Sequence, residues 1–228
     1  MVVGPWYGRP LHYRPTEAPL TKPPTPLARF SLARAYRHLR EADPRVAALI
    51  DAHGPYTPRP SADPYAALVR NVFHQQLGGA AANAIMRRTF ALFGDAESAP
   101  APADFLQATD AELRGAGLSR QKTSYLRDLA QHVVDGRLTL DGLGALDDAA
   151  VTAQLTSVRG IGVWTAHMFL MFHLGRPDVL PVGDLGVRKG MQAVYGLPEA
   201  PDAERAAAIG APWAPYRSVG SWYMWRAV

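Results

Sequence analysis

The stretch SVRGIGVWTA, residues 157–166, decides the fold of this chain. Gly160 and Gly162 lie two residues apart, and apolar, helix-like sequence flanks them on both sides. Because glycine is the worst helix former after proline, we expect one helix to end before this pair and another to begin after it. Both glycines are expected to adopt positive φ, so that the backbone turns sharply and another backbone can approach.

A helix that begins near Val163 would present peptide N–H groups without intrahelical partners. Such a helix start next to glycines forms a small anion site, and a DNA phosphate is the obvious anion. A tight αα-hairpin that binds nothing needs the same glycines. Taken alone, these ten residues leave both interpretations open.

The composition sets limits on the class of protein. The chain has 228 residues, 48% hydrophobic and 19% charged, which is typical of a globular protein large enough to bury a core. The absence of cysteine excludes a disulfide framework, a thiol nucleophile and Cys-ligated zinc or iron–sulfur clusters. No apolar run is long enough for a membrane span, and the N-terminus does not resemble a signal peptide. We expect a cytoplasmic protein, and the net charge of +4 permits an anionic partner.

Apolar spacing and capping residues predict an all-α protein. Helical patterns cover residues 27–52, interrupted at Pro44, and residues 65–93, broken at Gly78–Gly79. Further helices are predicted from local signals: a capping box of Thr109 and Glu112, Ser119 as a cap, Gly136 as a stop, and Asp147 or Asp148 as a cap. Residues 1–28 hold seven prolines and are expected to be an extended tail that is packed on the body or disordered.

Downstream of the hairpin, RPDVLPVGDLGVRKG (176–190) contains a turn at Pro181 and Gly183 and then Asp184 at the start of a helix. Read alone, Asp184 is an N-cap, as most such residues are. A carboxylate at a helix N-terminus also suits a group that faces developing positive charge.

Five segments together resemble the helix-hairpin-helix DNA glycosylase superfamily, in its DNA-3-methyladenine glycosylase II (alkylpurine DNA glycosylase) branch. They are QQLGGAAA (75–82), GLSRQKTSYL (117–126), LTSVRGIGVWTAHMFLM (155–171), DVLPVGDLGVRKG (178–190) and WAPYRSVGSWYMW (213–225). The resemblance covers residues 29–228 and implies two helical lobes around a central cleft, one formed by residues 61–176 and the other by 29–60 plus 177–228. The β-rich N-terminal domain of larger members is expected to be absent or vestigial.

The resemblance also implies roles for individual residues. Asp184 would be catalytic and stabilise oxocarbenium character on the sugar. Bifunctional relatives carry a Schiff-base lysine where this chain has Trp164, so the enzyme is expected to be monofunctional, without AP-lyase activity. Leu77 would be the wedge that fills the space of a flipped base, although it also fits a core position. Aromatic faces would hold the cationic base. The implied pocket residues are Trp164, Tyr216, Met168 (in place of a family aromatic) and Trp222, each of which also fits the core.

The hairpin would supply the DNA anchor. The implied phosphate-binding residues are Arg159, Gly160, Gly162 and Thr165. Arg188 and Lys189 could also touch phosphate, or lie on the surface or in ion pairs. The family hairpin often binds a monovalent cation, which implies a Na⁺ or K⁺ site at the main-chain carbonyls of Thr156, Val158 and Ile161. No cofactor is expected to be required, and the seven histidines, among them His74, His167 and His173, show no recognisable metal-ligand spacing.

The resulting hypothesis is a monomeric DNA glycosylase of base excision repair that acts on double-stranded DNA containing alkylated bases and associates with the nucleoid through that DNA. Its implied substrates are 3-methyladenine, 7-methylguanine, and also 1-methyladenine or 3-methylcytosine. Two alternatives stay open: a DNA-binding module that keeps the hairpin without turnover, and a helical scaffold or small-nucleoside hydrolase with an incidental hairpin.

Overall fold

A computed structural model describes residues 30–58 and 63–228, and the predicted Pro-rich segment 1–28 lies outside the described residues. Within the described ranges every regular element is a helix, which confirms the predicted all-α class. The α-helices are α1 (Leu32–Ala42), α2 (Pro44–His53), α3 (Pro64–His74), α4 (Gly79–Ala91), α5 (Pro102–Gln107), α6 (Asp110–Gly115), α7 (Arg120–Val134), α8 (Asp148–Thr156), α9 (Val163–Phe172), α10 (Leu185–Tyr195), α11 (Ala203–Gly210) and α12 (Arg217–Arg226). Two 3₁₀ turns, η1 (Leu143–Ala145) and η2 (Ala211–Trp213), complete the elements.

Short polar side chains determine where most helices begin. In each case the side-chain oxygen accepts a hydrogen bond from a backbone N–H of the first turn, which satisfies a donor that would otherwise lack a partner. The residues that cap in this way are Ser31, Asp43, Asp63, Thr109, Ser119, Asp147, Asp184 and Asp202. The predicted capping box is present, because Thr109 N donates to the Glu112 carboxylate at 2.8 Å while Glu112 N donates to Thr109 Oγ1.

The predicted breaks are also present. Pro44 begins α2 directly after Asp43, which ends α1 and caps α2. Gly78 is the N-cap of α4, so the apolar run of residues 65–93 forms two helices joined by the turn 75–78. That turn contains Gln76, a non-glycine residue with a φ of 57°.

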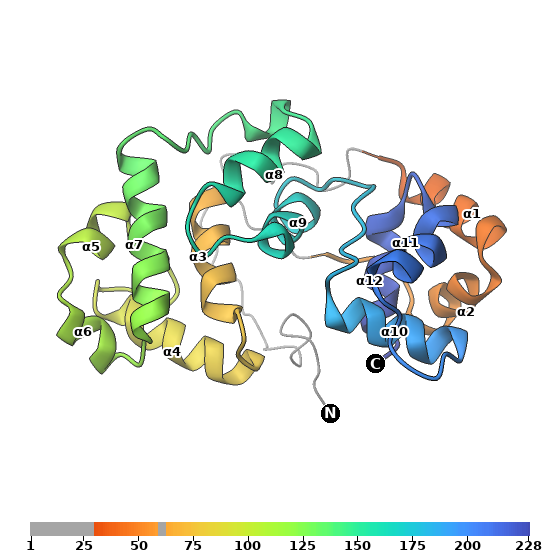
Figure 1. Cartoon of the computed structure of the whole chain (residues 1–228), viewed down its shortest axis with the longest axis horizontal. Coiled ribbons are helices and arrows are strands. Elements are labelled where there is room, and N and C mark those ends of the chain that lie inside the picture. Colours follow the sequence, from red (N-terminus) through yellow and green to blue (C-terminus); the bar gives the residue numbers. More distant parts are fainter. Residues whose placement is uncertain (1–29, 59–62) are drawn as a thin grey trace, which may run out of the picture.

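The helices form two groups along the long axis of the molecule (Figure 1). Helices α3 to α9 lie in one group, and α1, α2, α10, α11 and α12 lie in the other. Within the second group α10 packs closely on α12: a Cβ added at Gly190 would lie 2.1 Å from the carbonyl oxygen of Met224. The segment 173–184 connects α9 to α10 and therefore carries the chain from one group to the other.

Large apolar side chains fill the core of both groups. Phe73, Phe90 and Phe169 are buried in the α3–α9 group, and Trp213 and Tyr223 are buried in the other. No helix in residues 30–58 and 63–228 combines the length and apolar character needed to cross a membrane.

Candidate functional site

Asp184 is the buried N-cap of α10, and its carboxylate is held by three donors. Oδ1 accepts hydrogen bonds from Val187 N at 2.8 Å and from Trp225 Nε1 at 2.7 Å. Oδ2 accepts a hydrogen bond from Trp164 Nε1 at 2.6 Å. An ionised carboxylate can only accept hydrogen bonds, so three converging N–H groups are matched to it and fix its orientation.

Trp164 reaches Asp184 from the neighbouring group of helices. It lies in the first turn of α9, immediately after the hairpin, and is half-buried. Its indole therefore ties the start of α9 to the start of α10 through one side-chain hydrogen bond. Trp164, which was expected near the reaction centre, is therefore hydrogen-bonded to the expected catalytic carboxylate of Asp184.

Trp225 is the residue of this site that the sequence analysis did not single out. It lies near the end of α12, is 8% exposed, and donates its indole N–H to Asp184. Gly186 makes room for it, since an added Cβ would lie 2.7 Å from Trp225 Cδ1 and 3.1 Å from Asp184 Oδ1. The glycine in the motif DLG was the available signal, because it marks a close approach at the start of α10.

Trp222, one helical turn before Trp225, lies elsewhere. It is 2% exposed, and its ring packs edge-on against Tyr56 and against Tyr223. The expectation that Trp222 lines the base pocket is therefore corrected. Position along α12 decides the difference: Trp222 faces the residues that follow α2, whereas Trp225 reaches the N-terminus of α10.

The other two expected pocket residues are partly or fully covered. Met168 is 1% exposed and belongs to the apolar core around α9. Tyr216, directly before α12, is half-buried and packs against Phe30 and His38, with ring centroids 5.7 and 5.6 Å apart. Of these two side chains, only Tyr216 keeps a partly accessible ring in the described structure.

Gly160 adopts the positive φ that the hairpin was expected to need, with a value of 86°. The ring of Tyr125, from α7, covers this glycine, because an added Cβ would lie 2.1 Å from Tyr125 Cγ. The Tyr125 hydroxyl in turn accepts a hydrogen bond from Gln121 at 2.6 Å. Any larger residue at position 160 would collide with α7 and strain the backbone.

Gly162 differs from the expectation of positive φ. It is the N-cap of α9 with a φ of −93° and a ψ of 176°, an extended conformation that any residue adopts. No atom lies within 4 Å of an added Cβ, and the residue is exposed. Space in front of the helix start, rather than backbone conformation, is therefore what glycine provides here.

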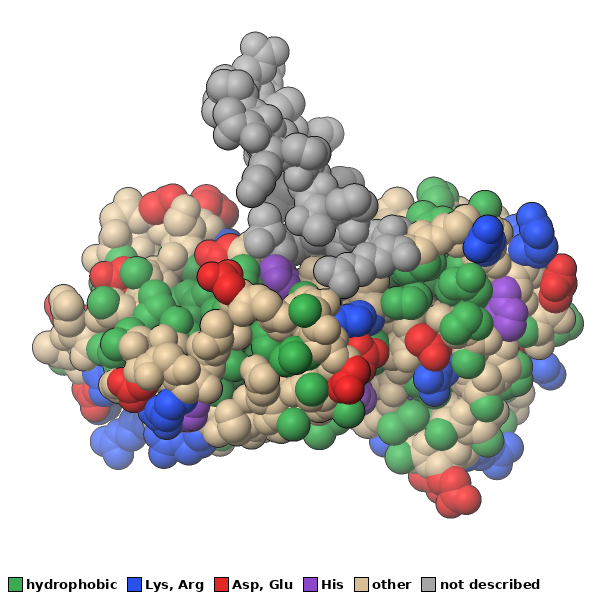
Figure 2. Space-filling view, turned by 90° about the horizontal axis from the view of Figure 1, so that it is seen from above, with side chains coloured by type: hydrophobic (Ala, Val, Ile, Leu, Met, Phe, Trp, Pro, Cys, Tyr) green, Lys and Arg blue, Asp and Glu red, His purple; other side chains and the backbone are tan. Residues whose placement is uncertain are grey.

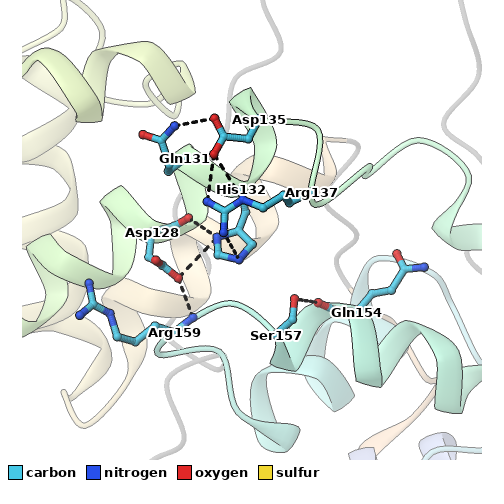
Figure 3. Close-up of polar contacts among 8 residues, drawn as sticks. All are labelled: Asp128, Gln131, His132, Asp135, Arg137, Gln154, Ser157 and Arg159. Atoms are coloured by element: carbon cyan, nitrogen blue, oxygen red, sulfur yellow. Dashed lines mark hydrogen bonds and ion pairs between the residues drawn. The ribbon is translucent and has the colours of Figure 1, made fainter.

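Asp128 of α7 accepts a hydrogen bond from the hairpin backbone. Its Oδ2 accepts a hydrogen bond from the backbone N–H of Arg159 at 2.8 Å (Figure 3). His132 lies beside it, with Nδ1 2.8 Å from the Asp128 carbonyl oxygen and Nε2 3.1 Å from the guanidinium of Arg137, which also binds Asp135. The Arg159 side chain points away from this network and is exposed.

Gln75 joins the α3–α4 turn to the hairpin. Its Nε2 donates to the Gly160 carbonyl oxygen at 2.7 Å and lies 3.4 Å from Thr165 Oγ1. Thr165 is only 2% exposed, and its hydroxyl lies in the first turn of α9 close to Gln75. Its predicted contact with phosphate stays a prediction.

Leu77 lies in the same turn and is half-buried. It lines a cavity of about 400 Å³ together with Gln75, Gly160 and Lys122. Lys122 donates a hydrogen bond to the carbonyl oxygen of Phe73, and burial lowers the pKa of its ammonium group. Leu77 is thus a residue at the edge of a cavity beside the hairpin, and it does not belong to the apolar core cluster.

Metal ligands are not grouped in the described parts of the chain, where no set of three or more His, Asp or Glu side chains could hold an ion. At the hairpin, the Val158 carbonyl oxygen accepts the N–H of Ile161 at 3.1 Å. The Thr156 hydroxyl donates back to Thr152 O. Of the two basic residues of α10, Arg188 donates to the carbonyl oxygen of Pro201, and Lys189 is exposed.

Comparison with known proteins gives a consistent answer. The sequence model of the HhH-GPD superfamily base excision DNA repair protein matches residues 69–215. DNA-3-methyladenine glycosylase 1 of Schizosaccharomyces pombe is 32% identical over 200 residues, covering 86% of this chain and 87% of that protein. Alkylbase DNA glycosidase-like protein mag2 of the same organism is 26% identical over 196 residues, covering 85% of this chain and 92% of that protein.

Solved structures agree with the sequence matches. The S. pombe 3-methyladenine DNA glycosylase in complex with abasic DNA has a TM-score of 0.78 and 31% identity, covering 85% of this chain and 95% of that chain. A DNA-3-methyladenine glycosidase from Bacillus halodurans has a TM-score of 0.73 and 36% identity, covering 85% and 88%. The fold, the hairpin and these similarities together establish that the chain belongs to the HhH-GPD superfamily of base excision DNA repair proteins.

Proposed function

We propose that this protein is a DNA-3-methyladenine glycosylase that binds duplex DNA through its hairpin and hydrolyses the N-glycosidic bond of alkylated bases. The observation that carries the proposal is the carboxylate of Asp184, fixed by Trp164, Trp225 and Val187 N at the point where the two groups of helices meet. The similarity to 3-methyladenine glycosylases over more than four-fifths of the chain supports it.

The chemistry follows from the charge that develops on the sugar. As the bond between C1′ and the base nitrogen breaks, its electron pair leaves with the base and C1′ gains oxocarbenium character. A fixed carboxylate beside C1′ stabilises that charge, and it can orient the water whose oxygen bonds to C1′ and accept a proton from it. A base that already carries a positive charge is a good leaving group, so no separate general acid is required.

We propose that the enzyme is monofunctional. A lyase step needs an amine that attacks C1′ to form a Schiff base, and the position after the hairpin that supplies a lysine in bifunctional relatives holds Trp164 here. The Trp164 indole nitrogen is instead committed to Asp184. The expected product is therefore an intact strand with an abasic site.

Recognition requires the damaged base to leave the duplex. We assign Leu77 as the wedge, since it lies at the edge of the cavity beside the hairpin and is not enclosed in the core. We assign the half-buried rings of Trp164 and Tyr216 as the pocket surfaces that attract a cationic base. Gly160 and Gly162 provide the hairpin backbone that approaches one phosphate, and the guanidinium of Arg159 beside them is a further donor to the phosphate backbone.

We also propose that the hairpin holds Na⁺ or K⁺ at the carbonyl oxygens of Thr156, Val158 and Ile161, which suit such a cation. The Val158 oxygen keeps one lone pair beyond its bond to Ile161 N. This ion would support DNA binding and is not needed for the chemistry. Duplex affinity should then be higher in potassium chloride than in tetramethylammonium chloride of equal ionic strength, and equal affinities would remove the cation from the proposal.

Base release tests the function directly. Duplexes with one 3-methyladenine, 7-methylguanine, 1-methyladenine or 3-methylcytosine are incubated with the protein, and the freed base is measured by chromatography. Strand breaks are scored on denaturing gels with and without alkali, and borohydride is added to trap any covalent adduct. We expect release of 3-methyladenine, strand breaks only after alkali, and no adduct.

The matched control is Asp184→Asn, which keeps the shape of the side chain and removes its charge. It should abolish release while duplex affinity stays the same or rises, because a negative charge near phosphates is lost. Release within a few-fold of the wild-type rate would reject Asp184 as the catalytic residue. Failure of the wild-type protein to release any base, despite tight duplex binding, would favour a DNA-binding module without turnover.

A further inference from the structure

A second cavity lies next to the hairpin. It has a volume of about 290 Å³ and is bounded by α6, α7 and the residue that precedes Gly160. Arginine dominates its lining: Arg114, Arg120, Arg127 and Arg159. Figure 2 shows Lys and Arg side chains gathered along the lower edge of the α3–α9 group, on the left of that view.

Three of these four arginines have guanidinium groups that no acidic side chain in the described ranges neutralises. The guanidinium groups of Arg114, Arg120 and Arg159 make no ion pair or side-chain hydrogen bond with any residue in the described ranges, and all three residues are exposed. Three cations that share one concave site repel one another in the free protein. A polyanion that enters the site would relieve this repulsion.

The fourth arginine holds the wall of the cavity. Arg127 donates to the Asp110 carboxylate at 2.6 Å, to Ala108 O at 2.7 Å and to Phe105 O at 3.3 Å. Asp110 is the only acidic residue among those that line this cavity. Because Arg127 already neutralises it, Asp110 does not cancel the charge of the three free guanidinium groups.

A buried hydroxyl without a partner belongs to one of the residues that line this cavity. Thr123 lines the cavity and is 5% exposed, yet its Oγ1 has no hydrogen-bond partner among the described residues. A buried polar atom without a partner costs free energy, and native structures rarely keep one without a reason. A side-chain shift that brought this covered oxygen to the cavity would let an anionic oxygen accept a hydrogen bond from it.

Arg159 connects this cavity to the DNA-binding hairpin. Its backbone N–H is anchored on Asp128, so the hairpin backbone keeps a defined relation to α7. The cavity lined by Leu77 lies beside Gly160, and the arginine cavity lies beside Arg159. Both cavities therefore border the hairpin, at adjacent residues.

We infer that the cavity lined by Arg114, Arg120, Thr123 and Arg159 binds a further phosphate of the DNA backbone, beyond the phosphate held by the hairpin. This inference rests on the proposed function for its ligand, duplex DNA. The shared chemistry is a phosphate oxyanion, which a backbone phosphodiester or free inorganic phosphate could supply, and the adjacent hairpin favours the backbone.

Neutral-linkage interference tests this site one phosphate at a time. A set of duplexes carries one uncleavable abasic-site analogue at a fixed position, which sets the register, and a single methylphosphonate at successive positions of one strand; each is titrated against the full-length protein. In the wild type we expect two separate positions at which neutralisation weakens binding. The double variant Arg114→Ala/Arg120→Ala should lose sensitivity at one of them and keep it at the other, while Gly162→Asp should show the reverse pattern.

Salt dependence and a matched control complete the design. Loss of one phosphate contact lowers the slope of log affinity against log salt by about one. The double variant should show that loss, while Arg205→Ala, an exposed arginine of α11, should retain the wild-type interference pattern. Thr123→Val should reduce the sensitivity to a methylphosphonate at the same position as the double variant does, without lowering the unfolding temperature.

Three results would overturn the inference. The first is a folded double variant with the wild-type slope and the wild-type interference pattern. The second is a rise in unfolding temperature with inorganic phosphate that depends on Arg114 and Arg120, combined with an unchanged interference pattern, which would assign the site to a free ion. The third is equal loss of sensitivity in Arg205→Ala. Because these duplexes contain no alkylated base to release, absence of base release in the separate assay would reject the proposed function without producing any of these results.

Discussion

The indole nitrogen of Trp164 lies 2.6 Å from Oδ2 of Asp184, so the residue that follows the hairpin glycines orients the proposed catalytic carboxylate. The two residues belong to the first turn of α9 and the N-cap of α10, which lie in different groups of helices. One hydrogen bond therefore connects the part of the chain proposed to anchor DNA with the part proposed to break the glycosidic bond.

Trp164→Phe should slow base release because it removes this hydrogen bond and keeps an aromatic face. Hydrogen bonds to charged groups are worth about 1.5–3 kcal/mol, so we expect a fall of about 10-fold or more in the single-turnover rate. Trp225→Phe should have a similar effect through Oδ1. Duplex affinity should change little in either variant.

Trp222→Phe is the matched control, since Trp222 lies on the same helix and packs against Tyr56 without contacting Asp184. It should lower the unfolding temperature and leave the rate of the folded protein near wild type. If Trp222→Phe slows base release as much as Trp225→Phe, the indole contact to Asp184 is not what matters.

Gly186→Ala should impair catalysis although alanine favours helix formation. Its Cβ would lie 2.7 Å from Trp225 Cδ1 and 3.1 Å from Asp184 Oδ1, so the indole and the carboxylate must move apart. Gly183→Ala is the control, because no atom lies within 4 Å of an added Cβ there. A rate for Gly186→Ala equal to that of Gly183→Ala would contradict the close packing around Asp184.

Substitution of Gly160 should lower stability, whereas substitution of Gly162 should weaken DNA binding. Gly160→Ala places a Cβ 2.1 Å from the Tyr125 ring and strains a φ of 86°, so it should lower the free energy of unfolding by more than about 1 kcal/mol. Gly162→Asp has open space and an extended backbone, so it should fold normally and bind duplex weakly because it repels phosphate.

Urea unfolding and duplex titration measure the two effects, with circular dichroism to establish that the variants are folded. A folded Gly162→Asp variant that binds undamaged duplex as tightly as the wild type, at the same salt concentration, would mean that the hairpin is only a turn. The duplex affinity of Gly162→Ala should lie between those of the wild type and Gly162→Asp, since alanine adds bulk without charge.

Gln75→Glu should break the hydrogen bond that joins the turn 75–78, which carries Leu77, to the hairpin. The variant replaces the amide that donates to Gly160 O at 2.7 Å with an acceptor that the carbonyl repels. We expect the turn that carries Leu77 to shift, which should slow the fluorescence change of a 2-aminopurine placed next to the lesion more than it weakens duplex binding. Gln154→Glu introduces the same charge on an exposed position of α8 and should leave the fluorescence change intact.

Stability should fall as the pH is lowered below about 6.5, the ordinary pKa of histidine. Burial lowers the pKa of His74 and of His167 in the folded protein. The unfolded chain therefore binds more protons in this range, so stability is fully present above about pH 6.5 and is lost as the pH falls through the folded pKa. Urea unfolding at pH 7.5 and 5.0 should show a decrease, and His74→Gln and His167→Gln should each reduce it; an unchanged decrease in both variants would assign it to other groups.

Much of the fold was predictable because the signals are local. Capping by Ser119, Asp147 and Asp184, the capping box of Thr109 and Glu112, and the breaks at Pro44 and Gly78 depend on residues a few positions apart. Each of these signals acts within one turn of the backbone. The sequence pattern therefore predicts its effect without knowledge of the tertiary structure. The family assignment likewise follows from short motifs, and the comparisons confirm it.

Contacts between distant segments were not predictable in the same way. Which tryptophan of α12 reaches Asp184 depends on how far α12 runs along α10, and a shift of one turn separates Trp225 from Trp222. The contact of Thr165 with Gln75 joins residues 90 positions apart in the chain. The arginine cavity exists only because α6, α7 and the hairpin pack together.

The sequence by itself therefore determined several helix starts, the hairpin and the position of Asp184 at a helix start, since hydrogen bonds within one turn govern these features. It did not reveal α5, whose first residues were expected to form a loop. The tertiary structure decided which side chains hold that carboxylate, which glycine needs positive φ and which arginines share a cavity. Those properties arise from the packing of helices that are far apart in sequence. Burial of apolar side chains determines that packing, and no local sequence pattern encodes it.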